Sequence, residues 1–295
     1  MEITTEMVKR LIKEQFPKWS HLKIYPVEKS GHDNRTFHLG KELTVRLPSA
    51  EEYAGQIEKE SRWLPYLQEH LDYPVSKSVA VGKPTDYYPF PWSVNCWIQG
   101  ETLLECPAAD KKLLAQDLAD ALRKLQAVGC EGGPGAGVQN FYRGGSLKVY
   151  EQETQEALEK LKDRLPTEIL GKIWNECIAE SYSGQPVWVH GDVAPGNILM
   201  REQRFWGLID FGVLGTGDPA CDYAMAWTYF DTESRKIFLQ GIPEDMVKRA
   251  RGWALWKALI TLDLPGMASC AEQTLQAILD ECGSAGAPAA AGQGR

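Results

Sequence analysis

The sequence predicts an α+β fold with two unequal lobes, a small β-rich lobe with one main helix and a larger, mostly helical lobe. Short strand-like runs punctuated by glycine fill the first third of the chain, whereas amphipathic helical spacing fills most of the remainder. Strands followed by a run of helices are typical of an α+β architecture. We place the lobes at residues 1–97 and 98–282, followed by a Gly/Ala-rich tail at 283–295 that we expect to be disordered.

Hydrophobic spacing predicts the elements of the small lobe. Met7, Val8, Leu11 and Ile12 fall on one side of a helix, and Gly40 punctuates two apolar runs as a hairpin turn does. In chain order we expect a helix at about 3–16, strands at 23–27, 36–39 and 43–47, a helix at 51–70, and strands at 79–81 and 92–98.

The larger lobe is predicted to be helical apart from one β segment. Leucines at 114, 118, 122 and 125 share one face of a helix at about 108–128, and residues 132–137 are a Gly-rich loop. Further helices are expected at 151–165, 168–181 and 244–264. The β segment, at about 187–210, interrupts them.

Composition limits the class of protein. With 295 residues, a net charge of −8 and a pI near 5.3, the chain is a poor ligand for nucleic acid or anionic lipid, because it cannot neutralise phosphate. Its seven cysteines form no C-x-x-C pair, which indicates reduced thiols rather than disulfides or a zinc site. The acidic N-terminus and the lack of a long apolar run predict neither a signal peptide nor a membrane span. We therefore expect a cytoplasmic monomer or weak dimer.

The β segment carries side chains suited to phosphoryl transfer. An apolar run at 187–189 leads into a loop with Asp192 and Asn197, and a hairpin then returns the chain to Asp210. One carboxylate and one amide suit Mg²⁺, which takes its other ligands from phosphates and water. A second carboxylate can accept the proton of a hydroxyl and orient it for attack.

The pattern His190-x-Asp192-x₄-Asn197, followed by Ile209-Asp210-Phe211-Gly212, resembles the catalytic and metal loops of aminoglycoside phosphotransferases. The resemblance implies a bilobal protein-kinase-like fold that uses Mg²⁺ and ATP, with GTP left open. It implies that Asp192 is the catalytic base, that Asn197 and Asp210 bind Mg²⁺, and that His190 organises the loop without reacting. As turn and cap residues alone, these side chains would have no reason to gather at strand ends within residues 190–210.

The resemblance also assigns nucleotide contacts in the small lobe. Relatives close a turn over the phosphates where this chain has Ser30, Gly31 and Asn34, although the full G-x-G-x-x-G is missing and an ordinary hairpin turn is the alternative. Arg46 stands where the family presents a lysine. Arginine keeps the charge and can bind phosphate bidentately, but its reach differs.

Two more contacts follow from the resemblance. Glu60 would be the helix glutamate that pairs with Arg46, the alternative being a surface helix charge. Trp97 and Ile98 belong to the hinge between the lobes, where backbone groups of relatives meet the edge of the adenine.

Further along the chain, residues of the matching motif are expected to have structural roles. Asp218 is expected to cap a helix that begins at Pro219. Asp222 supports the catalytic loop in relatives, and a solvated helix charge is the alternative. Trp253 and Trp256, at helical spacing, are expected in the core rather than in an acceptor pocket.

Together these features predict an ATP-dependent phosphotransferase that moves the γ-phosphoryl group to a hydroxyl of a small molecule. An aminoglycoside-type antibiotic is the favoured acceptor, which would make the chain a resistance enzyme. The alternatives are a metabolic kinase for an amino alcohol, a sugar or a macrolide, and a silent nucleotide-binding protein, suggested by Arg46. The intact set of Asp192, Asn197 and Asp210 argues against a silent protein.

Overall fold

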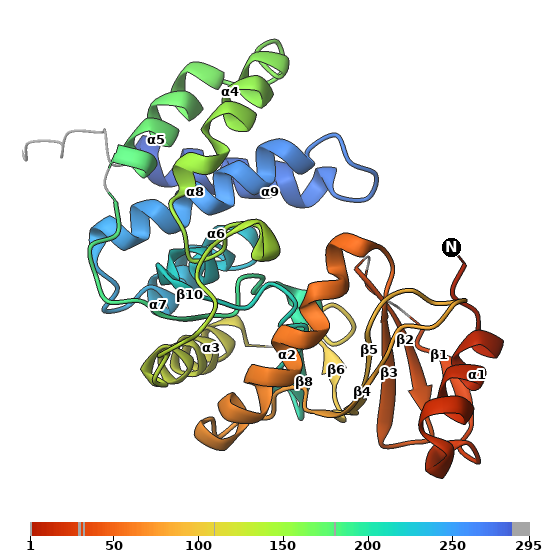
Figure 1. Cartoon of the computed structure of the whole chain (residues 1–295). Coiled ribbons are helices and arrows are strands. Elements are labelled where there is room, and N and C mark those ends of the chain that lie inside the picture. Colours follow the sequence, from red (N-terminus) through yellow and green to blue (C-terminus); the bar gives the residue numbers. More distant parts are fainter. Residues whose placement is uncertain (1, 29–30, 32, 109, 180, 285–295) are drawn as a thin grey trace, which may run out of the picture. The chain divides into compact units, whose positions relative to one another are not determined.

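The computed structural model describes residues 2–28, 31, 33–108, 110–179 and 181–284 (Figure 1). Contacts divide the chain into two units. The first comprises Met1–Ala109, Asp120–Gly145 and Pro186–Gly217, and the second comprises Asp110–Ala119, Ser146–Gln185 and Asp218–Arg295. The candidate catalytic segment therefore groups with the N-terminal strands.

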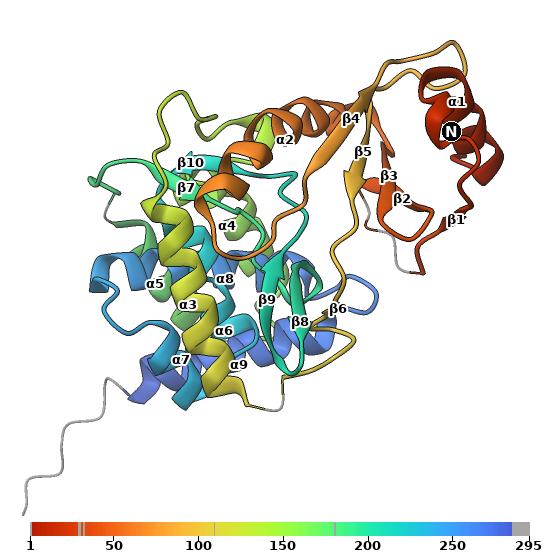
Figure 2. The same ribbon diagram turned by 90° about the horizontal axis from the view of Figure 1, so that it is seen from below.

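The first unit contains a five-stranded antiparallel sheet (Figure 2). Its strand order is β1-β2-β3-β5-β4. The strands are β1 (Ile24–Pro26), β2 (Asn34–Leu39), β3 (Leu43–Pro48), β4 (Ser78–Gly82) and β5 (Trp92–Cys96). The sequence predicted all five to within about two residues at each end.

The two faces of this sheet differ in chemistry. Helix α1 (Thr5–Gln15) packs Val8, Leu11 and Ile12 into one core with apolar residues of the strands, among them Val45 and Val94. Successive strand residues point to opposite faces, so the neighbours of these apolar residues lie on the other face.

That second face is polar and meets helix α2 (Glu51–His70). Thr44 lies opposite Asn95, and Arg46 lies opposite Ser93, in the register of β3 with β5. All four side chains are buried. The helix thus covers a polar face that includes the arginine singled out by the sequence.

The catalytic segment folds as two small β units. Strand β7 (Val187–Val189) pairs with β10 (Gly215–Gly217), and β8 (Ile198–Arg201) forms a hairpin with β9 (Arg204–Leu208). Strand β6 (Glu101–Thr102) pairs with β8 on its other side. The hairpin after residue 197 confirms the sequence prediction, whereas β10 was not expected.

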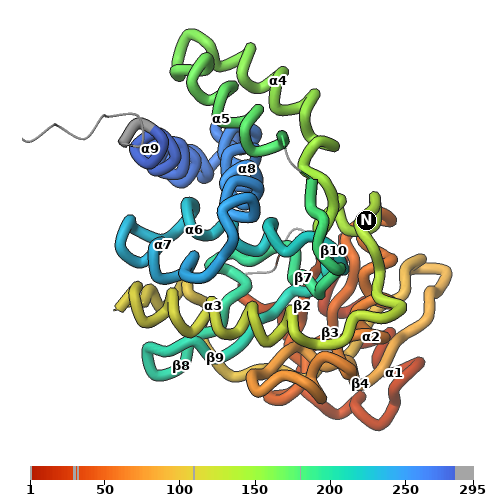
Figure 3. The backbone as a smooth tube through the Cα atoms, turned by 90° about the vertical axis from the view of Figure 1, so that its left-hand side faces the viewer, coloured from red at the N-terminus to blue at the C-terminus, as the bar shows by residue number. Residues whose placement is uncertain are grey.

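The second unit is helical. Helices α4 (Glu151–Lys160), α5 (Thr167–Ala179) and α8 (Glu244–Thr261) match predicted helices, as does α3 (Lys111–Ala127), which is shared between the units. The sequence did not predict α6 (Met225–Thr228), α7 (Thr232–Phe238) or α9 (Ala268–Ser284). Figure 3 shows α8 and α9 running side by side.

Helix α9 also changes the expected boundary of the tail. Its last two residues, 283 and 284, overlap the segment that was expected to be disordered, and the rest of that segment, 285–295, lies outside the described residues. Ala271, Leu275 and Ile278 are buried at helical spacing. That spacing was available in the sequence.

In the part of the chain that the structure describes, no helix is long and apolar enough to span a bilayer.

The packing of α1 on the sheet predicts the effect of one truncation. Ile12 is fully buried between the helix and the strands, so Ile12→Ala removes apolar contacts and leaves a cavity. We expect a loss of about 2–5 kcal/mol in the free energy of unfolding, measured by urea denaturation. Lys13→Ala, at the adjacent exposed position, is the control and should change it little. Equal effects of the two variants would contradict this packing.

Candidate active site

The loop after β7 begins with a turn that only glycine can make. Gly191 has φ 86°, and a Cβ placed on it would lie 2.7 Å from the carbonyl oxygen of Val213 and 3.0 Å from the Cβ of Arg143. A side chain there would be strained by both the backbone and the space. This turn follows a buried strand and leads directly to Asp192, which is half-buried.

His190 connects the loop to the end of β9. Its ring is fully buried; Nε2 donates to the carbonyl of Ile209 at 3.0 Å, and Nδ1 accepts from the backbone N–H of Asp192 at 3.2 Å. One nitrogen donates and the other accepts, which is the neutral Nε2–H tautomer. The ring also packs on Phe211, with centroids 4.4 Å apart. These contacts suit a residue that organises the loop.

Asn197 holds the backbone and the carboxylate of Asp192. Its Nδ2 donates to the Asp192 carbonyl at 2.9 Å and to Oδ2 at 3.0 Å. The backbone carbonyl of Asn197 accepts from the N–H of Ile209 at 3.0 Å. Because Asp210 follows Ile209, the structure brings Asp192, Asn197 and Asp210 to the same end of the β8–β9 hairpin.

Asp210 adopts a left-handed backbone conformation, with φ 62°. This conformation is costly for a residue with a side chain and persists only where the surroundings hold it. Phe211 is fully buried beside it, and the Asp210 side chain, 41% exposed, forms an ion pair with Arg46 (Oδ1 to Nη2, 2.8 Å). The carboxylate thus faces out of the core with one oxygen already bound to a cation.

Arg46 lies between two carboxylates. Its Nη1 is 2.8 Å from each carboxylate oxygen of Glu60, and its Nη2 contacts Asp210. Burial lowers the pKa of Arg46, but the charges of Glu60 and Asp210 outweigh it and raise the pKa above its ordinary value. The predicted pairing of Arg46 with Glu60 is confirmed, and a surface charge is the wrong description of Glu60, which is 2% exposed.

The segment before β2 is tied to α2 by a glutamine that the sequence analysis missed. Gln56 donates from Nε2 to Asp33 at 3.0 Å and accepts at Oε1 from Asn34 at 3.2 Å. Gly31 is exposed, and a Cβ built on it would lie 3.9 Å from Oδ2 of Asp210. Ser30, the third residue proposed for this turn, lies outside the described residues.

At the predicted hinge, one backbone donor is already used within the sheet. The N–H of Trp97 donates to the carbonyl of Glu42 at 2.7 Å, and its ring meets His38 edge to face with centroids 4.6 Å apart. Ile98 is half-buried directly after it.

Two aspartates of the second unit, Asp218 and Asp222, have structural surroundings. Asp218 caps the 3₁₀-helix Pro219–Tyr223 as expected, and it also accepts from Arg249 at 2.7 Å. Burial raises the pKa of Asp218 despite this arginine. Asp222 is fully buried, so a solvated charge is the wrong description of it.

The predicted core position of two tryptophans is also confirmed. Trp253 and Trp256 are buried, and the ring of Trp256 stacks on Tyr150 with centroids 4.0 Å apart.

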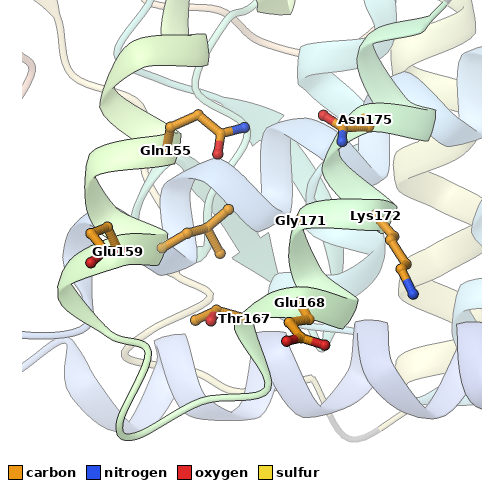
Figure 4. A pocket seen from close by; sticks show the side chains of 8 residues that line it. Gln155, Glu159, Thr167, Glu168, Gly171, Lys172 and Asn175 are labelled. Carbon is orange, nitrogen blue, oxygen red and sulfur yellow. The ribbon is translucent and has the colours of Figure 1, made fainter.

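An open hollow of about 570 Å³ lies between α4 and α5 (Figure 4). It is lined by Gln155, Leu158, Glu159, Thr167, Glu168, Gly171, Lys172 and Asn175. None of these belongs to the residues singled out above. Within the described ranges no three or more His, Cys, Asp or Glu side chains gather as a metal site.

A model of the Phosphotransferase enzyme family (APH) matches residues 26–259. The chain belongs to this family. No curated protein sequence matches it significantly.

Solved structures of related enzymes share the fold. The GDP complex of aminoglycoside 2'-phosphotransferase-IIIa has a TM-score of 0.74 at 19% identity and covers 95% of this chain and 100% of its own. The GDP and kanamycin complex of APH(2'')-IIIa has a TM-score of 0.69 at 19% identity, with 94% and 98% covered. The macrolide 2'-phosphotransferase MphH from Brachybacterium faecium has 0.59 at 18%, with 93% and 97% covered. The predicted kinase-like α+β fold is confirmed.

The buried ion pair predicts a pH-dependent loss of stability when the arginine is removed. Burial raises the pKa of Glu60 even though Arg46 lowers it, so Arg46→Met should raise that pKa further. The native variant then binds a proton that the unfolded chain releases, and its free energy of unfolding falls as the pH rises above the ordinary glutamate range. We expect a loss of about 3–5 kcal/mol near neutral pH and a smaller loss near pH 5, measured by chemical denaturation.

The double variant Arg46→Met/Glu60→Gln is the control, since it removes the titrating group and should flatten this pH dependence. A loss in Arg46→Met that is the same at both pH values would show that Glu60 is not the group responsible.

Proposed function

We propose that this chain transfers the γ-phosphoryl group of ATP to a hydroxyl of a small-molecule acceptor, with an aminoglycoside-type antibiotic as the favoured acceptor. One observation carries the proposal. Asp192, Asn197 and Asp210 lie at one end of the β8–β9 hairpin, and Arg46 binds the last of them from the sheet. Phosphoryl transfer depends mainly on this kind of positioning and charge neutralisation.

Asp192 is proposed as the base. Asn197 donates to its Oδ2 at 3.0 Å, which fixes the orientation of the carboxylate. The carboxylate would accept the proton of the acceptor hydroxyl and aim its oxygen at the phosphorus. Such assistance typically contributes roughly 10²–10⁴ in rate.

Asn197 and Asp210 are proposed to hold Mg²⁺. The amide hydrogens of Asn197 are directed at Asp192, so its Oδ1 is the atom that remains for a cation. Asp210 is partly exposed, and its ion pair with Arg46 uses the oxygen Oδ1. Two hard oxygen donors fit Mg²⁺, which when bound would neutralise phosphate charge and keep several of its waters.

Nucleotide binding is proposed for the first unit. Gly31, Ser30 and Asn34 are proposed to contact the phosphates, and Arg46 is proposed to contact them while it stays paired with Glu60. The backbone around Trp97 and Ile98 would meet the base. Solved relatives have been captured with GDP and, in the streptomycin–ATP–APH(2'')-IIa ternary complex, with ATP, which supports a purine nucleotide here.

The acceptor is proposed from charge and from the relatives. Kanamycin and streptomycin are bound in two of the related structures, and the acidic net charge of −8 suits a polycationic acceptor. A macrolide 2'-phosphotransferase shares the fold as well, so the macrolide alternative is tested beside the aminoglycosides. We propose residues 1–97 as the nucleotide-binding lobe and 98–282 as the catalytic and acceptor-binding lobe.

Replacement of the proposed base should separate chemistry from binding. Asp192→Ala removes the proton acceptor and one hydrogen bond of Asn197, whose bond to the backbone carbonyl of residue 192 remains, so we expect transfer to fall by roughly 10²-fold or more. The affinity for Mg²⁺-ADP should stay within about twofold. The measurement is Mg²⁺-dependent ADP release in a coupled assay, with aminoglycosides, macrolides and hydroxyl metabolites as acceptors.

Asp86→Ala, at an exposed aspartate, is the matched control and should behave as the wild type does. Stimulation by a cellular metabolite alone would favour a metabolic kinase over an antibiotic-modifying one. Transfer that survives in Asp192→Ala would contradict the assigned base, and nucleotide binding without transfer to any acceptor would favour a silent protein.

A further inference from the structure

Gln56 stands out as a buried polar side chain without a role in the proposed reaction. It lies on α2, is 2% exposed, and makes one hydrogen bond with each end of its amide. Nε2 donates to Oδ2 of Asp33, and Oε1 accepts from Nδ2 of Asn34. The orientation of the amide follows from the partner, because the carboxylate of Asp33 can only accept.

The same amide lies directly against the segment that follows Asp210. A Cβ placed on Gly212 would be 2.6 Å from Oε1 of Gln56 and 2.8 Å from its Cδ. No side chain fits at position 212 unless the glutamine moves. Gln56 therefore contacts two segments of the candidate site, Asp33–Asn34 and the backbone at Gly212.

Gln56 and Glu60 share one face of α2. They are four residues apart and so lie one above the other on the helix. Glu60 holds Arg46, and through it Asp210, while Gln56 holds Asp33 and Asn34. One face of α2 therefore contacts both segments of the first unit that are proposed to bind phosphate, the one at Asp33–Asn34 and the strand with Arg46.

We propose that Gln56 is a positioning residue that sets the segment before β2 at a fixed distance from residues 210–212. Gly31 and Asp210 already lie close together, with 3.9 Å between a Cβ built on the former and Oδ2 of the latter. Both would then face the same phosphates. This inference rests on the proposed function, since it names the group that aligns the two sides of the nucleotide site.

Position 56 requires a neutral side chain of the length of glutamine that can both donate and accept a hydrogen bond. Glutamate would place a carboxylate against Asp33, in a region that already holds Glu60 and Asp210 with Arg46 as their bound cation. Leucine would keep much of the volume but would remove Oε1, the oxygen of Gln56 to which Nδ2 of the buried Asn34 donates. Each change alters the position of the segment and spares the proposed base.

The test uses the full chain with Gln56→Glu and Gln56→Leu. We expect both to raise the dissociation constant for Mg²⁺-ADP and the KM for ATP about tenfold or more, the usual effect of removing a group that orients a ligand-binding side chain. The KM for the acceptor should change by less than about twofold. Gln56→Glu keeps the shape of the side chain and guards against a failure of Gln56→Leu to fold, which thermal melting checks.

Gln68→Leu is the matched control on the same helix. Gln68 also uses both ends of its amide, accepting from the N–H of Val75 at 3.0 Å and donating to the carbonyl of Tyr73 at 3.5 Å. A purely structural role of Gln56 predicts that both positions lower the melting temperature and leave the nucleotide constants alone. Folded Gln56→Glu with wild-type affinity for Mg²⁺-ADP would overturn the proposal.

Nucleotide binding and phosphoryl transfer by the wild-type protein test the role of Gln56 and the proposed function separately. Wild-type protein that binds Mg²⁺-ADP but transfers to no acceptor would overturn the transfer, and the affinities of the variants would still decide the role of Gln56. Wild-type protein that binds no nucleotide would overturn both.

Discussion

The candidate site depends on the two ion pairs that the guanidinium of Arg46 forms with Glu60 and Asp210. This guanidinium joins β3 to α2 through Glu60 and to the end of the β8–β9 hairpin through Asp210, so three segments distant in sequence meet at one buried cation. A buried charge is tolerated only when its partners and hydrogen bonds are complete. The planar fork of arginine can bind both oxygens of one carboxylate and still reach a second, whereas a lysine ammonium is a single point charge.

Helix α2 converts that local pairing into a fixed arrangement. Glu60 and Gln56, one turn apart, make four of the contacts that define the site, and the backbone at Gly212 fills the space beside them. The left-handed conformation of Asp210 is held from both sides, by the ion pair with Arg46 and by the buried ring of Phe211. Backbone strain of this kind is retained where the surroundings over-determine it.

Local patterns in the sequence predicted most of the elements and the partners whose spacing is short. Helix 51–70 matches its predicted bounds, and the hairpin after residue 197 follows from two apolar runs around a polar turn. Gln56 was missed because Asp33, Asn34 and Gly212 reach it only through the tertiary fold. The hinge shows the same limit, since no pattern of side chains tells which sheet partner takes the N–H of Trp97.

The charges around Arg46 show how an arginine can serve at the position where the resemblance to the family places a lysine. Glu60 binds Nη1 with both oxygens and so balances the arginine by itself, which leaves the second carboxylate, Asp210, as the net negative charge of the cluster. That carboxylate is the partly exposed one, and its Oδ2 faces Gly31 rather than Arg46. A negative, accessible oxygen beside the segment proposed to bind phosphate suits a divalent cation. Arginine at this position therefore fits the proposed metal site, and its ion pair holds the side chain of Asp210, the residue with the left-handed backbone.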